Sequence, residues 1–305
     1  MYNDTHLNVL ISYAYLYNQQ PFIDFVKEQS SRGKINLMID SGAFTKFNSK
    51  SAFSHINVQD YSKFLQEWKQ YAEKYVMLDV IGNRAQSVHN YETMLDYGLN
   101  PMFVATIYDN DFDYIRKAVS RNPDICVAGG ATCKSPWMIK RFQDVYRQTN
   151  KQARIHGLGY FTFPNMLRLN LRSVDSSSWK TAAARFGQAV VFSERERRTY
   201  RVGWREICSK KRTFSTEIKE MLRQCCVLPS MYVDKNYHVC ENSIELFINI
   251  LTNLKLQKYC KRYGLHYFFA VGALTDLERV VYVSENLNNI TYTKFLDRFG
   301  KGSVK

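Results

Sequence analysis

Three aspartates, Asp40, Asp79 and Asp175, each end a short run of apolar residues. A side chain in that position lies at the end of a buried strand, where a single aspartate usually caps a turn or a helix. Three carboxylates at one edge of a sheet indicate chemistry instead, because two of them can divide the roles of nucleophile and general acid/base. These residues are therefore the first candidates for a catalytic site.

The elements that must position these carboxylates alternate between short apolar runs and longer helical patterns. We expect strands at residues 8–16, 35–44, 76–81, 101–108, 125–128, 154–158 and 173–176, and a helix over 60–75. Such alternation is typical of βα units around a parallel sheet. Polar residues or glycines end strand after strand, which favours a barrel with its site along the carboxyl rim over a doubly wound sheet with one switch point. The expected fold is therefore α/β, a (β/α)8 TIM-like barrel with an elaborated C-terminal third.

The simplest domain organisation is one domain over residues 1–305, because no linker or internal repeat interrupts the sequence. Barrel motifs occupy 8–192, a basic segment follows at 194–212, and C-terminal helical elements extend over 213–305. Within this last part, residues 267–271 have the pattern of a further strand.

The chain is strongly basic: among its 305 residues, 42 Lys and Arg stand against 28 Asp and Glu, a formal net charge of +14. Such an excess favours a polyanionic partner, with nucleic acid ahead of a membrane surface. The longest apolar runs are too short to span a bilayer, so we expect no membrane insertion. An odd number of cysteines, seven, and no N-terminal signal segment favour a reducing, intracellular compartment.

Four short motifs occur in order along the chain: Asp-Ser-Gly-Ala-Phe at 40–44, Gly-Gly at 129–130, His-Gly-Leu-Gly at 156–159 and Val-Asp-Ser at 174–176. They resemble the Asp-Ser-Gly-Gly-aromatic, Gly-Gly, Met-Gly-Val-Gly and Phe-Asp-Cys motifs of tRNA-guanine transglycosylases. Each motif alone is weak, but four in order are fairly specific, and they match over about half of the chain. The chain is most similar to the compact viral and bacterial members that insert 7-deazaguanines into DNA, the DpdA type.

The resemblance implies a role for each matched residue. Asp175 would attack C1′ of the target guanosine and form a covalent ribosyl ester. Asp40 would protonate the leaving base and deprotonate the incoming one. Asp79 would accept hydrogen bonds from the Watson–Crick edge of the purine, and Phe44 would stack on one face. The expected substrate-binding residues are Ser41, Gly42, Phe44, Asp79, Gly129, Gly130, His156 and Gly157. A turn cap remains the alternative role for Asp175, and a place in the core for Phe44.

The sequence departs from the family pattern in three places. The Gln-Gly-Gly of the fourth strand is replaced by Val-Ala-Thr-Ile-Tyr at 104–108. His156 replaces a methionine that covers the base; an imidazole can stack there or support the site from the core. The C-terminal zinc motif is missing, because the Cys and His of that region lack the paired spacing of zinc ligands. These residues are Cys225, Cys226, His238, Cys240 and Cys260. We expect no metal and no cofactor, and prefer buried free cysteines to a zinc site.

The basic segment at 194–212 interleaves eight Arg and Lys with two aromatic residues and three Glu. Arginines grip the phosphate backbone, and aromatic rings stack on unpaired bases. A solvated surface loop held by salt bridges is the alternative. The expected nucleic-acid-binding residues are Arg195, Arg197, Arg198, Arg201, Trp204 and Arg205.

The expected function is the exchange of guanine in DNA for a free 7-deazaguanine base such as preQ0 or preQ1, in the cytoplasm of a bacterial or phage-infected cell. DNA is preferred because the chain is compact and the zinc appendage of the tRNA enzymes is not evident. The same exchange on tRNA is the first alternative. A non-catalytic nucleic-acid-binding subunit on the same barrel is the second, but it would need neither Asp40 nor Asp175. Any such exchange requires an extruded or single-stranded nucleotide.

Overall fold

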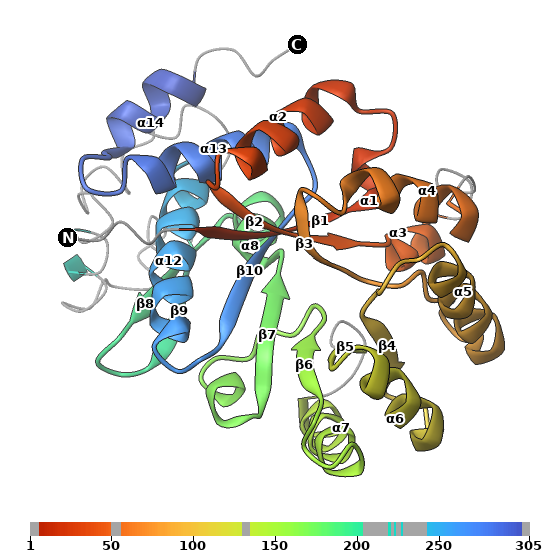
Figure 1. The fold of residues 1–305 in the computed structure, drawn as a ribbon. Coiled ribbons are helices and arrows are strands. Elements are labelled where there is room, and N and C mark those ends of the chain that lie inside the picture. Colours follow the sequence, from red (N-terminus) through yellow and green to blue (C-terminus); the bar gives the residue numbers. More distant parts are fainter. Residues whose placement is uncertain are drawn as a thin grey trace. The chain divides into compact units, whose positions relative to one another are not determined.

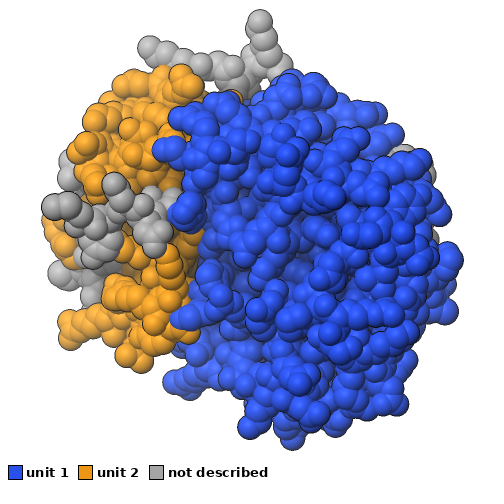
Figure 2. Space-filling model, in the orientation of Figure 1, with its two compact units in different colours: residues 1–176, 264–276 blue, residues 177–263, 277–305 orange. Residues whose placement is uncertain are grey.

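The computed structural model describes residues 6–49, 56–129, 135–203 and 243–300, together with residues 219, 220, 223 and 227. The chain divides into two compact units, shown in different colours in Figure 2. The first unit comprises Met1–Ser176 and Gly264–Asp276, and the second comprises Ser177–Tyr263 and Leu277–Lys305. None of the helices in the described ranges is both long and apolar enough to cross a bilayer.

The first unit is built on one sheet of eight parallel strands (Figure 1). In chain order the strands are β1 (Leu7–Ser12), β2 (Ile35–Asp40), β3 (Ala72–Tyr75), β4 (Phe103–Thr106), β5 (Asp124–Ala128), β6 (Arg154–Gly157), β7 (Leu171–Ser176) and β10 (His266–Val271). Their spatial order is β3-β2-β1-β10-β7-β6-β5-β4. A parallel bridge between Val76 and Met102 joins the two edge strands. The expected TIM-like (β/α)8 fold is thereby confirmed, with β10 as the eighth strand.

Helices connect each strand of the sheet to the next strand along the chain. They are α1 (Tyr13–Leu16), α2 (Gln20–Ser31), α3 (Ala43–Asn48), α4 (Val58–Trp68), α5 (Arg84–Asp96), α6 (Phe112–Arg121) and α7 (Ser135–Gln148), with a short 3₁₀ helix at Asn165–Arg168. Side-chain N-caps start four of them: Ser12 for α1, Asn57 for α4, Asn83 for α5 and Asp111 for α6 each accept a hydrogen bond from a backbone N–H of the first turn. Such caps satisfy amides that have no partner within the helix. They fix where each helix begins, and so the path of the loop before it.

The core of this unit lies within the strands and beneath the helices, because parallel strands of this kind are covered on both faces. All six residues of β1 are buried, as are four of the five in β5. Large aromatic side chains fill the space under the helices, among them Trp68 and Tyr91. The fully buried Tyr61 donates a hydrogen bond from its hydroxyl to the carbonyl of Val76 at 2.8 Å. This bond ties α4 to the strand that carries the bridge between the sheet edges.

Several element boundaries differ from the sequence-based prediction. The second strand, expected over 35–44, ends at Asp40, and residues 43–44 begin α3. Residues 13–16, expected in the first strand, form α1, because the Ser12 hydroxyl accepts a hydrogen bond from Ala14 N–H and starts a helical turn. Residues 72–75, expected at the end of a helix, form β3, since α4 ends at Trp68. The expected third strand over 76–81 contributes only Val76 to the sheet. The apolar spacing continues past Trp68 with no glycine or proline to mark the helix end.

The second unit contains the elaborated C-terminal part. Its elements are α8 (Ser178–Phe186), the antiparallel hairpin of β8 (Gln188–Ser193) and β9 (Arg198–Gly203), α12 (Ser243–Lys261), most of α13 (Leu274–Glu285) and α14 (Tyr292–Phe299). The fully buried Asn249 of α12 organises this unit. Its amide donates to the carbonyls of Trp179 at 2.8 Å and Gln188 at 3.1 Å, and its carbonyl accepts from Val190 N–H. One side chain thus joins α12 to α8 and β8.

Candidate active site

The three aspartates are brought to the same end of the barrel. Asp40 is the last residue of β2, Asp175 is the last but one of β7, and Asp79 follows β3. Because all eight strands are parallel, their carboxyl ends and the loops after them form one rim, called the barrel mouth below. Burial is the main cause that raises the pKa of both Asp40 and Asp79; in addition, the charge of Asp175 raises the pKa of Asp40, and the charge of Asp40 raises the pKa of Asp79. Asp40 therefore lies within electrostatic reach of both Asp79 and Asp175.

Asp40 is held so that it exchanges a proton near neutral pH. Burial raises the pKa of Asp40 from its ordinary value of 3.8 to about 6, against an opposing hydrogen bond from the backbone N–H of Gly42. That N–H lies 2.9 Å from Oδ2. The charge of Asp175 adds to the rise. A carboxyl group with a pKa in this range can both donate and accept a proton at physiological pH, as a general acid/base must.

The turn after Asp40 requires glycine at position 42. Gly42 has a φ of +83°, and a Cβ there would lie 2.8 Å from both Ala14 Cβ and Ser12 Oγ. Ser41 is fully buried, and its hydroxyl accepts a long hydrogen bond of 3.4 Å from Ala43 N–H. Ser41 and Gly42 thus shape the turn that carries Asp40. Phe44, in the first turn of α3, leaves 51% of its surface exposed at the mouth.

Asp175 is oriented by two hydrogen bonds to one of its oxygens. The backbone N–H of Gly159 donates to Oδ1 at 2.7 Å, and Nε2 of His156 lies 3.1 Å from the same oxygen. A carboxylate can only accept, so Nε2 carries the proton in this arrangement. Nδ1 of His156 lies 2.8 Å from Ser173 Oγ, so that both ring nitrogens are within hydrogen-bond distance of a β7 side chain. No hydrogen bond from the described residues reaches Oδ2 of Asp175, which leaves that oxygen available to attack a ligand.

The register of two neighbouring strands creates this arrangement. His156 of β6 pairs with Ser173 of β7, and Asp175 lies two residues further along on the same face of the strand. The imidazole is fully buried and contacts the ring of Phe268 edge-on at 6.1 Å between centroids. Of the two roles considered for His156, the structure places it in the core beneath Asp175, where it supports the carboxylate.

Asp79 lies between the barrel mouth and a cavity. Burial is the main cause that raises the pKa of Asp79 from 3.8 to about 7, and the charge of Asp40 adds to it. The side chain lines a cavity of about 540 Å³ that also contacts α3 and α5. Asp79 is therefore protonated part of the time at neutral pH, and can donate as well as accept a hydrogen bond.

Packing within the barrel explains two of the expected glycines. Gly129 has a φ of +127°, and a Cβ there would lie 2.8 Å from Ile107 Cγ2. A Cβ at Gly157 would lie 3.2 Å from Phe142 Cζ and equally near Tyr160 Cβ. Gly129 thus excludes a side chain whether or not a ligand is bound, whereas a side chain at Gly157 would have to displace its neighbours by a few tenths of an ångström. Gly130 lies outside the described residues.

Residues 194–203 of the basic segment form the β8–β9 turn and strand β9, in the second unit. Arg195, Arg197, Arg198 and Arg201 are exposed at the β8–β9 turn and along β9. Nε of Arg198 lies 2.9 Å from a carboxylate oxygen of Glu196, and its guanidinium stacks on a tyrosine ring of the same strand. Arg198 therefore has the salt bridge expected of a solvated surface. The expected contacts Trp204 and Arg205 lie outside the described residues.

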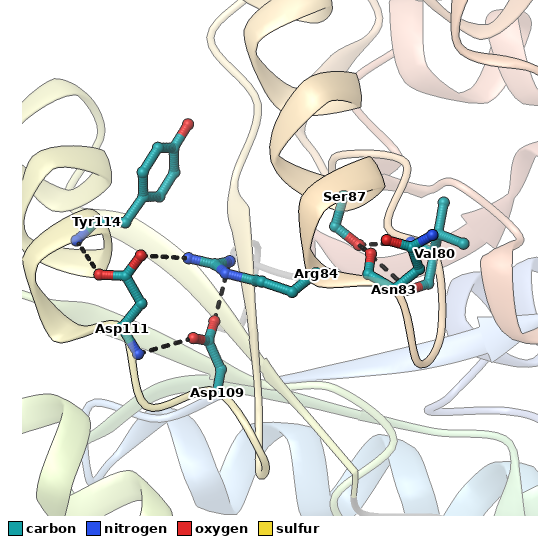
Figure 3. A network of polar contacts seen from close by, with 7 residues as sticks. All are labelled: Val80, Asn83, Arg84, Ser87, Asp109, Asp111 and Tyr114. Atoms are coloured by element: carbon teal, nitrogen blue, oxygen red, sulfur yellow. Dashed lines mark hydrogen bonds and ion pairs between the residues drawn. The ribbon is translucent and has the colours of Figure 1, made fainter.

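An ion-pair network that sequence reasoning missed braces the loops after β3 and β4 (Figure 3). Nη1 of Arg84, the first residue of α5, lies 2.9 Å from the nearly buried Asp109, and Nη2 lies 3.9 Å from Asp111. The guanidinium also stacks on the rings of Phe103 and Tyr114. An Asp-Asn-Asp sequence after a strand indicates a helix cap, which Asp111 provides, but it does not reveal the distant arginine.

Exposed aromatic rings are concentrated at the barrel mouth. Of the large apolar side chains exposed in the described ranges, five follow barrel strands at their carboxyl ends: Tyr15, Phe44, Phe47, Tyr108 and Trp137. Tyr108 is 83% exposed and Trp137 is 66% exposed. These rings border the same rim as the three aspartates.

No cluster of His, Cys, Asp and Glu able to hold a metal occurs in the part of the chain that the structure describes. Cys126 of β5 and Cys260 of α12 are buried free thiols. Cys225, Cys226, His238 and Cys240 lie outside that part.

Comparison with protein-family models, with curated proteins and with solved structures gave no match.

Proposed function

We propose that the protein is a base-exchanging transglycosylase, a member of the tRNA-guanine transglycosylase superfamily, that replaces guanine in DNA with a 7-deazaguanine. The observation that carries this proposal is the pairing of two differently held carboxylates, Asp40 and Asp175, at one barrel mouth. Asp40 has a pKa of about 6, whereas Asp175 accepts two hydrogen bonds on a single oxygen. Two carboxyl groups in different environments are the pattern of a nucleophile beside a general acid/base.

In a double displacement at C1′ of a guanosine, Asp175 is the nucleophile and Asp40 transfers the protons. Oδ2 of Asp175 attacks C1′, the bond from C1′ to guanine breaks, and Asp40 donates its proton to a ring nitrogen of the leaving base. Asp40, now ionised, removes the proton from N9 of the incoming 7-deazaguanine. That nitrogen then attacks C1′, and the ester bond to Asp175 breaks. Each group ends the cycle in its starting protonation state.

His156 and Gly159 position the nucleophile, Asp175, in this scheme. Their hydrogen bonds to Oδ1 of Asp175 hold the carboxylate in place, and Oδ2 is then the oxygen that attacks. Asp79 receives the Watson–Crick edge of the purine, as the resemblance implies. Its partial protonation near neutral pH suits an edge that presents both donors and an acceptor.

The polymer substrate is an unpaired stretch of nucleic acid, because C1′ of a stacked nucleotide cannot be attacked. The exposed rings at the mouth, chiefly Tyr108 and Trp137, offer stacking faces for such bases. The formal charge of +14 and the exposed arginines of the β8–β9 hairpin favour a polyanion.

Incubation with a labelled 7-deazaguanine and equal amounts of DNA and unmodified tRNA tests the proposal. We expect label in DNA from the wild-type protein and none from the Asp175→Asn variant. The Asp113→Asn variant, changed at a carboxylate whose side chain is 93% exposed on α6, serves as the matched control and should retain activity. If label appears in tRNA alone, the substrate is tRNA and not DNA. Full activity in Asp175→Asn would refute the nucleophile assignment.

A further inference from the structure

A chain of three polar side chains leads from the interior of the barrel to Asp175. Oγ of Ser173 lies 2.8 Å from Nδ1 of His156, and Nε2 of His156 lies 3.1 Å from Oδ1 of Asp175. Ser173 is 3% exposed, His156 is 0% exposed and Asp175 is 6% exposed. Buried polar groups need partners within the protein, and each member of this chain supplies one to the next. The three side chains therefore act together, with Asp175 at the outer end.

The direction of this chain distinguishes it from the Ser-His-Asp triads of hydrolases. In those triads the serine meets the substrate, and the aspartate is buried behind the histidine. Here Ser173 precedes Asp175 by two residues on β7, which places the serine roughly 6–7 Å further from the barrel mouth. The serine is thus too deep to meet a ligand, and the aspartate is the member that reaches the mouth. Any effect of Ser173 on the reaction must pass through His156.

The hydrogen-bond partners of an imidazole determine which nitrogen carries its proton. Asp175 in its ionised, attacking form can only accept, so Nε2 of His156 is the donor to Oδ1. A neutral imidazole then has its lone pair on Nδ1, where the Ser173 hydroxyl is within reach to donate. The ring of Phe268, which contacts the imidazole edge-on, has no polar group to offer. The Ser173 hydroxyl is accordingly the group that fixes Nδ1.

This anchor is needed most when Asp175 is an ester. In the free protein the negative charge of Asp175 helps to hold the Nε2–H group, because hydrogen bonds to ionised acceptors are roughly twice as strong as those to neutral ones. Once Oδ2 is bonded to C1′, Oδ1 is a neutral ester carbonyl oxygen and holds the imidazole more weakly. The bond between Ser173 and Nδ1 is unchanged, and it becomes the main restraint on the His156 ring.

The second displacement depends on the two N–H groups at Oδ1. As N9 of the incoming base attacks C1′, the electron pair of the C1′–Oδ2 bond returns to Asp175 and is shared between its two oxygens. The N–H groups of His156 and Gly159 stabilise this returning charge at Oδ1. We propose that Ser173 is a positioning residue that holds His156 with its proton on Nε2, and so speeds the departure of Asp175 from C1′. This inference rests on the proposed function.

The two displacements are measured separately by rapid quenching, first as ester formation on a guanine-containing single-stranded oligonucleotide and then as transfer to an added, labelled 7-deazaguanine. We expect Ser173→Ala to slow transfer about tenfold, the equivalent of one lost hydrogen bond, and ester formation much less, so that the ester accumulates. Ser173→Thr, which keeps a hydroxyl and suits a strand, should restore transfer. Equal slowing of both steps, or slowing that Ser173→Thr does not reverse, would show a merely structural role and overturn the proposal.

Ser62→Ala is the matched control. Ser62 of α4 is also fully buried, but its hydroxyl has no hydrogen-bond partner within the part of the chain that the structure describes. The substitution makes the same chemical change as Ser173→Ala without removing a bond, so both displacement rates should stay at the wild-type values. A loss of transfer equal to that of Ser173→Ala would overturn the specific role of Ser173.

Nitrogen NMR of the protein labelled at its histidines tests the proton positions without any reaction. Comparison with His156→Gln identifies the His156 signals among the six histidines. In the wild type and in Ser62→Ala we expect a protonated Nε2 and an unprotonated Nδ1 whose signal is shifted by an accepted hydrogen bond, and we expect Ser173→Ala to lose this shift. A proton on Nδ1 of the wild-type protein would overturn the inference, and this result needs no variant at position 173 to fold.

The two experiments separate this inference from the proposed chemistry. If the wild-type protein forms no ester with the oligonucleotide, the transglycosylase proposal falls. If it forms the ester and Ser173→Ala transfers at the wild-type rate, the role of Ser173 falls alone.

Discussion

Replacing Asp79 with asparagine should stabilise the folded protein at pH 8 and have little effect near pH 4. Burial, aided by the charge of Asp40, raises the pKa of Asp79 from 3.8 to about 7. An asparagine side chain has the shape of the protonated acid but never ionises. The substitution therefore removes the free energy needed to ionise a buried group and keeps its packing.

The magnitude follows from the two pKa values. Each pKa step corresponds to about 1.4 kcal/mol, so a pKa near 7 in place of 3.8 corresponds to roughly 4 kcal/mol. The sign follows from proton binding: between these values the folded state holds more protons at Asp79 than the unfolded state does. The stabilising contribution of protonated Asp79 is complete below pH 3.8 and is lost as the pH rises through about 7. Because Asp79 remains partly exposed, we expect Asp79→Asn to raise the free energy of unfolding by about 2–4 kcal/mol at pH 8.

Urea unfolding followed by tryptophan fluorescence at pH 4 and pH 8 measures this difference. The control is Asp96→Asn, at the exposed last residue of α5, which should change stability by less than about 0.5 kcal/mol at either pH. A gain that is the same at both pH values, or a loss at pH 8, would show that the environment of Asp79 does not oppose its ionisation. A stability cost of this kind is what the proposed role of Asp79 in binding the purine would explain.

Three other substitutions test other parts of the structure. Gly42→Ala should lower both stability and exchange activity. At a φ of +83°, with Ala14 Cβ only 2.8 Å away, the added Cβ must distort the turn that carries Asp40. We expect the free energy of unfolding, measured by heat or urea, to fall by about 1–3 kcal/mol. Asn249→Ala should destabilise the protein by about 2 kcal/mol or more in the same assay, since it leaves buried backbone groups without partners. Trp137→Ala should weaken binding of single-stranded DNA by about 1–3 kcal/mol in fluorescence anisotropy, whereas Tyr97→Ala, after the far end of α5, should not. Unchanged binding by Trp137→Ala would remove that ring from the nucleic-acid surface.

The sequence was sufficient for the barrel because buried parallel strands have a local signature. Continuous apolar runs such as 125–128, ended by a glycine, predicted strands close to those observed, and Asp40 and Asp175 were correctly placed at strand ends. The end of α4 was missed because its apolar spacing continues through Tyr71, and the chain turns into β3 without a glycine or proline.

Contacts between distant residues could not be derived from the sequence. The bond from His156 to Asp175 depends on the register of β6 against β7, which a single sequence does not determine. The same holds for Arg84 and Asp109, which come from loops after different strands. The hairpin at 188–203 was missed as well, because its exposed arginines on β9 conceal the alternation expected of a strand.

The most direct test of the central claim is the identification of the covalent intermediate. The wild-type protein is mixed with a single-stranded guanine-containing oligonucleotide in the absence of free 7-deazaguanine, quenched in acid and digested, and the peptides are analysed by mass spectrometry. We expect an oligonucleotide ester on the peptide that contains Asp175, its disappearance when a 7-deazaguanine is added, and no ester in the Asp175→Asn variant. An ester on another residue, or base exchange by the Asp175→Asn variant, would contradict it.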